Sequence, residues 1–220
     1  AQLHIHAPQE TAEFLNVVQK IYCEAIDYEI LFHPVNTREH YLIYEDRSVE
    51  VWSIPMNHRV SCAGFLFREK QPLPHIRREM IDAFDIPVSQ INNIKAGASW
   101  TTEDGTVIPH ERLIIPAAPA RSYAYCSDTR YAPEIAKWIE GVDLLYHEAT
   151  FAQEFLVQAR KTMHSTAREA ALVAQQAGVK KLIIGHYSAR IKDESILLNE
   201  AREVFQNTIL AKERSKVAIL

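Results

Sequence analysis

Apolar runs of strand length fall into two groups along the chain. In the first third, alternating, β-branched and aromatic positions predict strands at 3–7, 28–32, 41–44, 49–54 and 63–67. After Pro8, apolar residues at helical spacing predict a helix that runs to about Ala25. We therefore expect a β-rich, antiparallel first third.

The last hundred residues alternate between strand-like and helix-like patterns. Strands are expected at 121–126, 142–146, 181–185, 208–211 and 216–220, with helices near 133–139, 150–160, 166–177 and 193–205. A β-rich part followed by β/α alternation predicts an α/β fold, layered as at least half of an αββα sandwich.

The middle of the chain, from residue 68 to about 119, is looser and rich in proline. It contains one expected helix near 76–84 and an expected hairpin turn at 103–105. A long insertion inside a compact fold is more often functional than idle.

Composition excludes some classes of protein. The 220 residues are 47% hydrophobic and 24% charged, and no apolar stretch is long enough to cross a membrane. A net charge of −4 argues against a generally basic nucleic-acid coat, although it allows a local basic patch. The odd set Cys23, Cys62 and Cys126 favours reduced thiols and a cytoplasmic protein.

Polar side chains that suit metal binding follow three of the predicted strands. His58, Asp128 and His186 supply two imidazoles and one carboxylate, a ligand set that suits zinc. Singly, each residue could simply cap a turn, so the prediction depends on the constellation. His4 and His6 also form an H-x-H pair, for which a structural role is the better interpretation.

Two further histidines precede possible helix caps. Thr150 and Thr166 fit helix capping boxes, which leaves His147-Glu148 and His164 unexplained. These histidines could donate a proton to a leaving oxygen or hold a phosphate. Arg190 is a candidate phosphate contact, with a surface ion pair as the alternative.

Together these motifs resemble the ribonuclease Z family, the tRNA 3′-processing endonucleases of the metallo-β-lactamase superfamily. The resemblance is carried by Pro55-Met-Asn-His58, Tyr125-Cys-Ser-Asp-Thr129, His147-Glu-Ala-Thr-Phe151, His164-Ser-Thr-Ala167 and His186-Tyr-Ser-Ala-Arg190, in family order. It implies an αββα sandwich of metallo-β-lactamase type and a zinc-dependent endoribonuclease that removes the 3′ trailer from precursor tRNA by attack of a metal-activated hydroxide.

The resemblance also implies a role for each residue. His58 would ligate one zinc ion, Asp128 would bridge two, and His186 would ligate the other. His147, supported by Glu148, would handle the proton of the leaving 3′-oxygen. His164 would be a further catalytic residue, near the scissile phosphate. Thr166, Ser188 and Arg190 would bind the RNA substrate.

The family further suggests a cytoplasmic homodimer that binds precursor tRNA, with neither DNA nor a membrane as partner. A substrate-binding arm would be inserted at about 68–100 in a single domain that spans 1–220. Arg68, Lys70, Arg77, Arg78 and Lys95 stand there against four acidic residues, so the segment is slightly basic.

The His-x-His-x-Asp-His signature of the superfamily is absent from these 220 residues. We therefore expect an N-terminally incomplete domain, inactive alone. Two other functions stay open: another metal-dependent phosphodiesterase or hydrolase of the superfamily that acts on a different ester, or a non-catalytic module for RNA binding or dimerisation.

Overall fold

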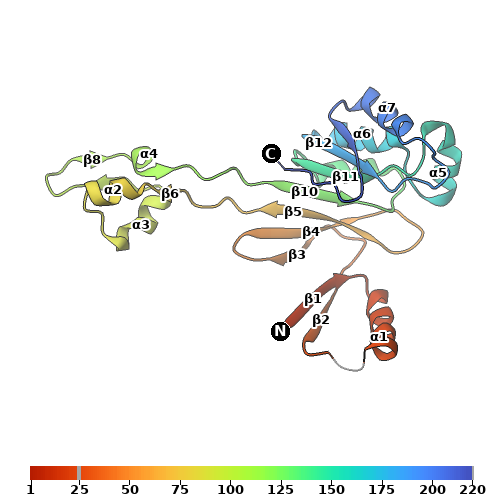
Figure 1. The fold of residues 1–220 in the computed structure, drawn as a ribbon, viewed down its shortest axis with the longest axis horizontal. Coiled ribbons are helices and arrows are strands. Elements are labelled where there is room, and N and C mark those ends of the chain that lie inside the picture. The colour runs from red at the N-terminus through yellow and green to blue at the C-terminus, as the bar shows by residue number, and fades with distance from the viewer. Residues whose placement is uncertain (24–25, 220) are drawn as a thin grey trace. The chain divides into compact units, whose positions relative to one another are not determined.

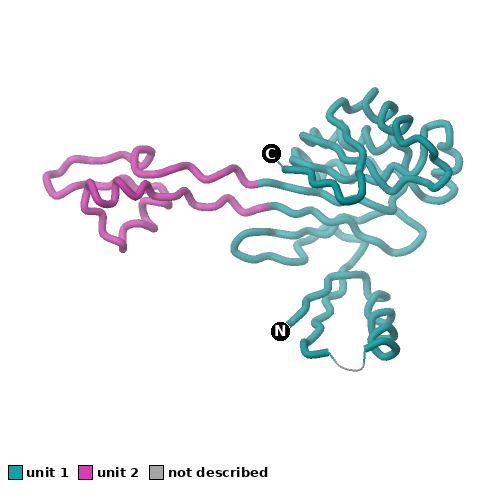
Figure 2. Tube along the Cα trace, in the orientation of Figure 1, with its two compact units in different colours: residues 1–68, 121–220 teal, residues 69–120 magenta. Residues whose placement is uncertain are grey.

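The computed structural model describes residues 1–23 and 26–219. The chain divides into two compact units, one formed by 1–68 and 121–220 and the other by 69–120 (Figure 2). Unit 2 is thus an insertion between two neighbouring strands of unit 1.

The centre of unit 1 is a mixed seven-stranded sheet with the strand order β13-β12-β11-β10-β5-β4-β3 (Figure 1). The last four strands of the chain run parallel, whereas β10 pairs with β5, and β3 with β4, in antiparallel fashion. The strands are β3 Leu42–Glu45, β4 Val49–Pro55, β5 Ala63–Glu69, β10 Ser122–Cys126, β11 Leu144–Glu148, β12 Lys181–Gly185 and β13 Thr208–Leu210.

Helices pack against one face of this sheet and bury the main core. Helix α6 (Ala167–Ala177) contacts β11, β12 and α7 (Ser195–Val204), and its buried positions are mostly alanine. Small side chains let the helix approach the sheet closely. Against it pack apolar residues of the sheet that are almost fully buried: Ile54, Leu66, Ala124, Leu145, Leu182 and Ile184.

Capping residues define where α6 begins and ends. Thr166 accepts a hydrogen bond from the backbone N–H of Glu169, and the carboxylate of Glu169 accepts one from the N–H of Thr166. This capping box confirms the prediction for Thr166. Gly178 ends the helix at φ 61°, a left-handed conformation that glycine adopts without steric cost.

The opposite face of the sheet is aromatic. Phe67 stacks on Tyr123 with ring centroids 6.0 Å apart, and Tyr125 stacks on Tyr146 at 4.8 Å. Phe67 and Tyr125 each keep 38% of their surface exposed. The two faces therefore differ in both burial and residue type.

The N-terminal residues form a separate two-stranded sheet of β1 (Gln2–Ala7) and β2 (Glu29–Pro34). These strands are parallel, so the expected antiparallel arrangement is wrong for this pair. Helix α1 (Glu10–Tyr22) lies between them in sequence and provides the crossover that parallel neighbours need. The expected helix end at Ala25 falls outside the described residues.

Most elements expected in the last hundred residues are confirmed, with three differences. The helices expected near 133–139 and 150–160 begin as 3-10 turns, η1 (Pro133–Lys137) and η2 (Gln153–Phe155), and the second continues as α5 (Leu156–Thr162). No strand forms at 216–219, the described part of the last expected strand.

Unit 2 has a small core of its own, made of Ile86, Ile94, Ile108, Leu113 and Ile114. Its β7–β8 hairpin turns at Gly105, which has φ 85°, as the turn pattern predicts. The elements are β6 His75–Ile76, α2 Arg78–Ala83, α3 Val88–Lys95, β7 Trp100–Thr101, β8 Val107–Ile108, α4 His110–Leu113 and β9 Ile114–Ile115.

Unit 2 extends to residue 120, beyond the segment 68–100 expected to act as an arm. Its role in substrate binding stays a prediction. Among the described residues, no helix is both long and apolar enough to cross a membrane.

Gly185, the last residue of β12, packs closely against the side chain of Tyr146 on the neighbouring strand. A Cβ atom there would meet the Tyr146 hydroxyl and lie 2.8 Å from its ring carbon Cε2. We predict that Gly185→Ala lowers the free energy of unfolding by about 1–3 kcal/mol through overpacking. Urea denaturation in the Tyr146→Ala background should show a smaller penalty; an equal penalty in both backgrounds would contradict this explanation.

Candidate active site

A fully buried carboxylate, Glu148 at the end of β11, lies at the centre of the candidate site. Its Oε1 accepts hydrogen bonds from the Thr129 backbone N–H at 2.6 Å and from His164 Nδ1 at 2.8 Å. Its Oε2 accepts from the Thr150 hydroxyl at 2.5 Å and from the Ser165 N–H at 3.1 Å. These four donors connect the segments after β10 and β11 with the start of α6.

The charge of this carboxylate is stabilised despite its burial. Burial alone raises the pKa of Glu148, but the hydrogen bonds from His164, Thr150 and Ser165 outweigh it and the net pKa is lowered. The hydrogen bond to Glu148 in turn raises the pKa of His164 above its usual value, against the opposing effect of burial. Glu148 and His164 therefore each favour the charged form of the other.

His186 is oriented by the same network. The single hydroxyl proton of Thr150 goes to Glu148, so the 2.8 Å contact between Thr150 Oγ1 and His186 Nδ1 requires Nδ1–H to donate. This leaves Nε2 of His186 with a free lone pair, 3.2 Å from Oδ1 of Asp128. Anchoring one ring nitrogen and presenting the other is how proteins position metal-binding histidines.

Asp128, His164 and His186 form a cluster with potential ligand atoms within 4.8 Å of one another. His58 flanks this cluster: its ring centroid lies 4.8 Å from that of His164, and its Nδ1 contacts the Met163 carbonyl at 2.9 Å. The centroids of His164 and His186 are 5.2 Å apart. The His164 ring is thus a neighbour of both histidines expected to bind metal.

Three residues of this region have left-handed backbones although none is glycine: Asp128 (φ 58°), Met163 (φ 60°) and His186 (φ 61°). Asp128 follows β10 after one intervening residue, and His186 comes directly after β12. Both strands are parallel neighbours of β11, so the carboxyl ends of the three strands lie at one edge of the sheet. Such conformations concentrate at functional sites, where surrounding contacts maintain them.

His147 lies apart from this cluster. It belongs to β11, where it shares a face with Leu145, and it has no exposed surface. Its Nδ1 bonds to the Glu148 carbonyl at 2.7 Å, while its Nε2 is buried without a hydrogen-bond partner among the described residues. Burial lowers the pKa of His147, partly offset by that hydrogen bond, so the ring is held neutral.

The three residues expected to bind the substrate differ in how exposed they are. Thr166 is fully buried, and its hydroxyl caps α6 and donates to Gln153 at 2.9 Å. Ser188 and Arg190 follow β12 on the loop after His186, with Arg190 exposed. The Ser188 hydroxyl accepts from the Arg190 N–H at 3.4 Å. The substrate contacts of Thr166, Ser188 and Arg190 stay predictions.

The sequence-based interpretation missed the roles of Thr129 and Ser165. Thr129 accepts a hydrogen bond from the Asn57 N–H at 3.0 Å, and the Ser165 hydroxyl donates to the Thr129 carbonyl at 2.7 Å. They connect the loop that carries His58 to those that carry Asp128 and His164. The available signal was the placement of a small hydroxyl residue directly after Asp128 and after His164.

The cysteines supply no nucleophile to this site. All three are free thiols. Burial raises the pKa of Cys126 to about 12, and burial together with the charges of Asp128 and Glu148 raises that of Cys62 to about 11. Both thiols therefore stay protonated at neutral pH.

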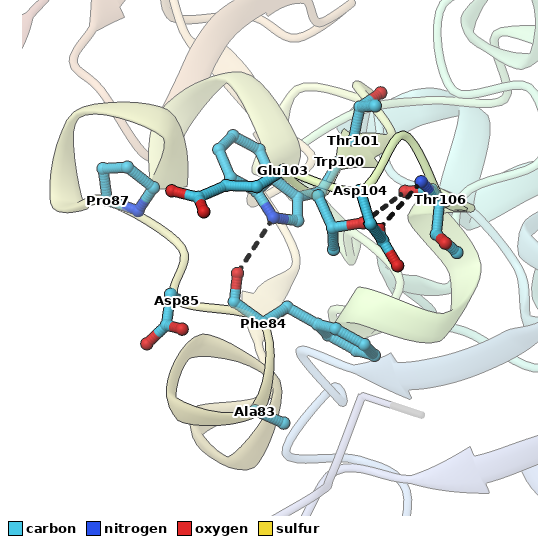
Figure 3. A pocket seen from close by; sticks show the side chains of 10 residues that line it. Ala83, Phe84, Asp85, Pro87, Trp100, Thr101, Glu103, Asp104 and Thr106 are labelled. Carbon is cyan, nitrogen blue, oxygen red and sulfur yellow. Dashed lines mark hydrogen bonds between the residues drawn. The ribbon is translucent and has the colours of Figure 1, made fainter.

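Unit 2 contains a cavity of about 720 Å³, between the end of α2 and the β7–β8 hairpin (Figure 3). Trp100 forms one wall, with its indole N–H donating to the Phe84 carbonyl at 3.1 Å. The charged groups that line it are all acidic: Asp85, Glu103 and Asp104. Because phosphate would be repelled here, this cavity does not suit a nucleic-acid backbone.

Comparisons with known proteins identify the superfamily and the fold of the chain. Residues 74–187 match the family described as the Beta-lactamase superfamily domain. Of the solved structures, human tRNase Z, short form, aligns with a TM-score of 0.61 at 18% identity, covering 100% of this chain and 68% of that one. The metallo-beta-lactamase fold protein YhfI from Bacillus subtilis aligns with a TM-score of 0.58 at 16% identity, covering 96% and 63%. These likenesses confirm the predicted fold class.

Sequence relatives are much closer. The chain is 52% identical over 219 residues to ribonuclease Z of Bacteroides thetaiotaomicron, covering 100% of the chain and 69% of that protein. It is 45% identical over 215 residues to ribonuclease Z of Porphyromonas gingivalis, covering 98% and 71%. The chain belongs to the ribonuclease Z family of the β-lactamase superfamily.

Proposed function

We propose that the chain supplies the catalytic machinery of a zinc-dependent endoribonuclease that removes the 3′ trailer from precursor tRNA. The proposal rests on one observation above all: the buried Glu148 orients His164 beside Asp128 and His186 in a member of the ribonuclease Z family. A metal-ligand cluster with an adjacent carboxylate-supported imidazole is suited to hydrolysis of a phosphodiester.

The donor set fits divalent metal ions. Carboxylate oxygen and imidazole nitrogen are ligands of zinc, and Nδ1 of both His58 and His186 is engaged elsewhere, which leaves Nε2 for a metal. Asp128, His186 and His58 would hold the ions. Bound there, the metals would act as Lewis acids on the phosphodiester.

We assign the proton-handling role to His164 in place of His147. His147 is fully buried among core residues, so its imidazole cannot touch a substrate in this conformation. His164 is partly exposed and donates through Nδ1 to Glu148, so Nε2 is the nitrogen able to deliver a proton. It would protonate the ribose 3′-oxygen as a water-derived oxygen bonds to phosphorus and the P–O3′ bond breaks. The products would be a 3′-hydroxyl on the tRNA and a 5′-phosphate on the trailer.

Other features of the proposal come from the resemblance. Ser188 and Arg190 would contact RNA beside the scissile phosphate, and the protein would act as a cytoplasmic homodimer. Unit 2 carries five Lys and Arg residues against seven Asp and Glu, so its contact with tRNA would depend on shape more than on charge.

Cleavage of a labelled precursor tRNA tests the function. The enzyme would be a zinc-loaded chimera of these residues with the part of the Bacteroides thetaiotaomicron ribonuclease Z that they do not cover. We expect a single cut after the discriminator base, and a loss of about 10²–10⁴-fold in kcat for His164→Ala. Hydrolysis of a chromogenic phosphodiester without cleavage of precursor tRNA would contradict the assigned substrate.

Zinc titration calorimetry on the 220-residue chain tests the ligand assignment. Asp128→Ala should lower zinc affinity by at least about 10-fold because it removes a ligand, whereas His164→Ala should leave affinity nearly unchanged. An equal loss for both variants would make His164 a ligand, and the proton role would then fail.

Stability as a function of pH tests the structural role of His147. The pKa of His147 is lowered in the folded protein, so the unfolded chain binds the proton more readily. The contribution of the neutral imidazole to folding stability is therefore fully present above about pH 6.5 and is lost as pH falls. The stability advantage over His147→Asn, which keeps a donor for the Glu148 carbonyl, should shrink by up to about 1.4 kcal/mol per pH unit between pH 6.5 and 5. A pH-independent difference in urea denaturation would refute a buried neutral imidazole.

A further inference from the structure

A second, smaller pocket of about 290 Å³ opens beside His164. His164 lines this pocket and also lies beside Asp128 and His186, so the pocket and the candidate active site share a wall. Its other charged lining residues are Arg130, Arg160, Glu134 and Glu169. No predicted site residue apart from His164 lies in it.

Both arginines are placed by rigid elements. Arg130 follows Thr129, and its backbone N–H donates to the Asn57 carbonyl at 2.9 Å. Arg160 is in the last turn of α5, and its carbonyl accepts from the Met163 N–H at 3.3 Å, next to His164. Their backbones are therefore fixed by the same loops that carry the site.

The guanidinium groups are available to a ligand. Both arginines are exposed, and within the described ranges neither forms an ion pair with Glu134 or Glu169, although all four residues line the pocket. The carboxylate of Glu169 is engaged by the Thr166 N–H at 3.0 Å and is nearly buried. Two unpaired guanidinium groups on one concave surface are suited to a phosphate.

The position of the pocket indicates which phosphate it would take. In the proposed function, His164 delivers its proton to the leaving 3′-oxygen, so RNA beyond His164 lies on the leaving-group side of the scissile bond. The nucleotide there carries its own 5′-phosphate into the pocket. The loop with Ser188 and Arg190 follows β12 and does not line this pocket.

We propose that Arg130 and Arg160 bind the phosphate on the 5′ side of the nucleotide whose 3′-oxygen leaves. This inference rests on the proposed function and deepens it: the pocket would position the last nucleotide of the mature tRNA for cleavage. Arg130 and Arg160 are thus binding residues, and the contact would be made both before and during the reaction.

RNA binding to the zinc-loaded 220-residue chain tests the proposal without needing turnover. The probe is a fluorescent acceptor-stem RNA with a 3′ trailer, and fluorescence anisotropy gives Kd. Arg130→Gln/Arg160→Gln should weaken binding about 10- to 100-fold. It should also reduce the magnitude of the salt slope by about 0.7, the value for one phosphate of a single strand. The matched control is Arg168→Gln, an exposed arginine on α6 that pairs with Glu203, and it should bind like wild type.

Neutral methylphosphonate substitutions in the same RNA identify the phosphate. Replacing the phosphate 5′ to the leaving nucleotide should weaken binding to wild type, but not weaken further the binding to the double variant. Replacing the phosphate after the trailer's first nucleotide should affect both proteins equally.

The outcomes distinguish a failure of this inference from a failure of the proposed ribonuclease function. RNA binding and chimera cleavage that are unchanged in the double variant overturn the arginine pocket and leave the ribonuclease assignment standing. The proposal is also overturned if both methylphosphonate substitutions weaken RNA binding equally and their effects add to that of the double variant. Absence of RNA binding by wild type, together with an inactive chimera, would overturn both.

Discussion

The buried carboxylate of Glu148 is the constraint on which the site depends. A charged group without exposed surface is tolerated only when its lone pairs are filled, and Glu148 accepts from Thr129, Thr150, His164 and Ser165. Because these donors belong to three separate segments, satisfying one carboxylate also fixes the relative positions of those segments. Through Thr150 the same carboxylate sets the tautomer of His186, and directly it sets that of His164.

The backbone conformations around Glu148 depend on this network. Asp128, Met163 and His186 hold left-handed φ angles, which cost a non-glycine residue roughly 1–2 kcal/mol each. Each is tied by a hydrogen bond: the Asp128 carbonyl accepts from Cys62, the Met163 carbonyl contacts His58, and His186 contacts Thr150. The core beneath, where the alanine face of α6 meets the sheet, stabilises the strand ends that carry these residues.

Local patterns predicted most of the fold, since strands, helix caps and the unit 2 hairpin each have a sequence signature. The parallel pairing of β1 with β2 was missed because pairing direction depends on the path of the chain through α1. In the site, the predicted residues Asp128, His164 and His186 do come together. The burial of His147 was missed because the apolar run was taken to end at residue 146. The strand continues to Glu148, and its alternation turns His147 into the core and Glu148 toward the site. Contacts such as Thr129 with Ser165 join residues far apart in sequence, and no local pattern encodes them.

Zinc affinity of Glu148→Gln is the most direct test of this account. All four partners of the carboxylate are donors, so an amide NH₂ in either orientation faces donors where acceptors are required. If Glu148 orients the site, titration calorimetry should show zinc affinity about 10- to 100-fold below wild type. Glu203→Gln, which alters only an exposed ion pair with Arg168, should match wild type. A folded Glu148→Gln protein that binds zinc as tightly as wild type would contradict the account.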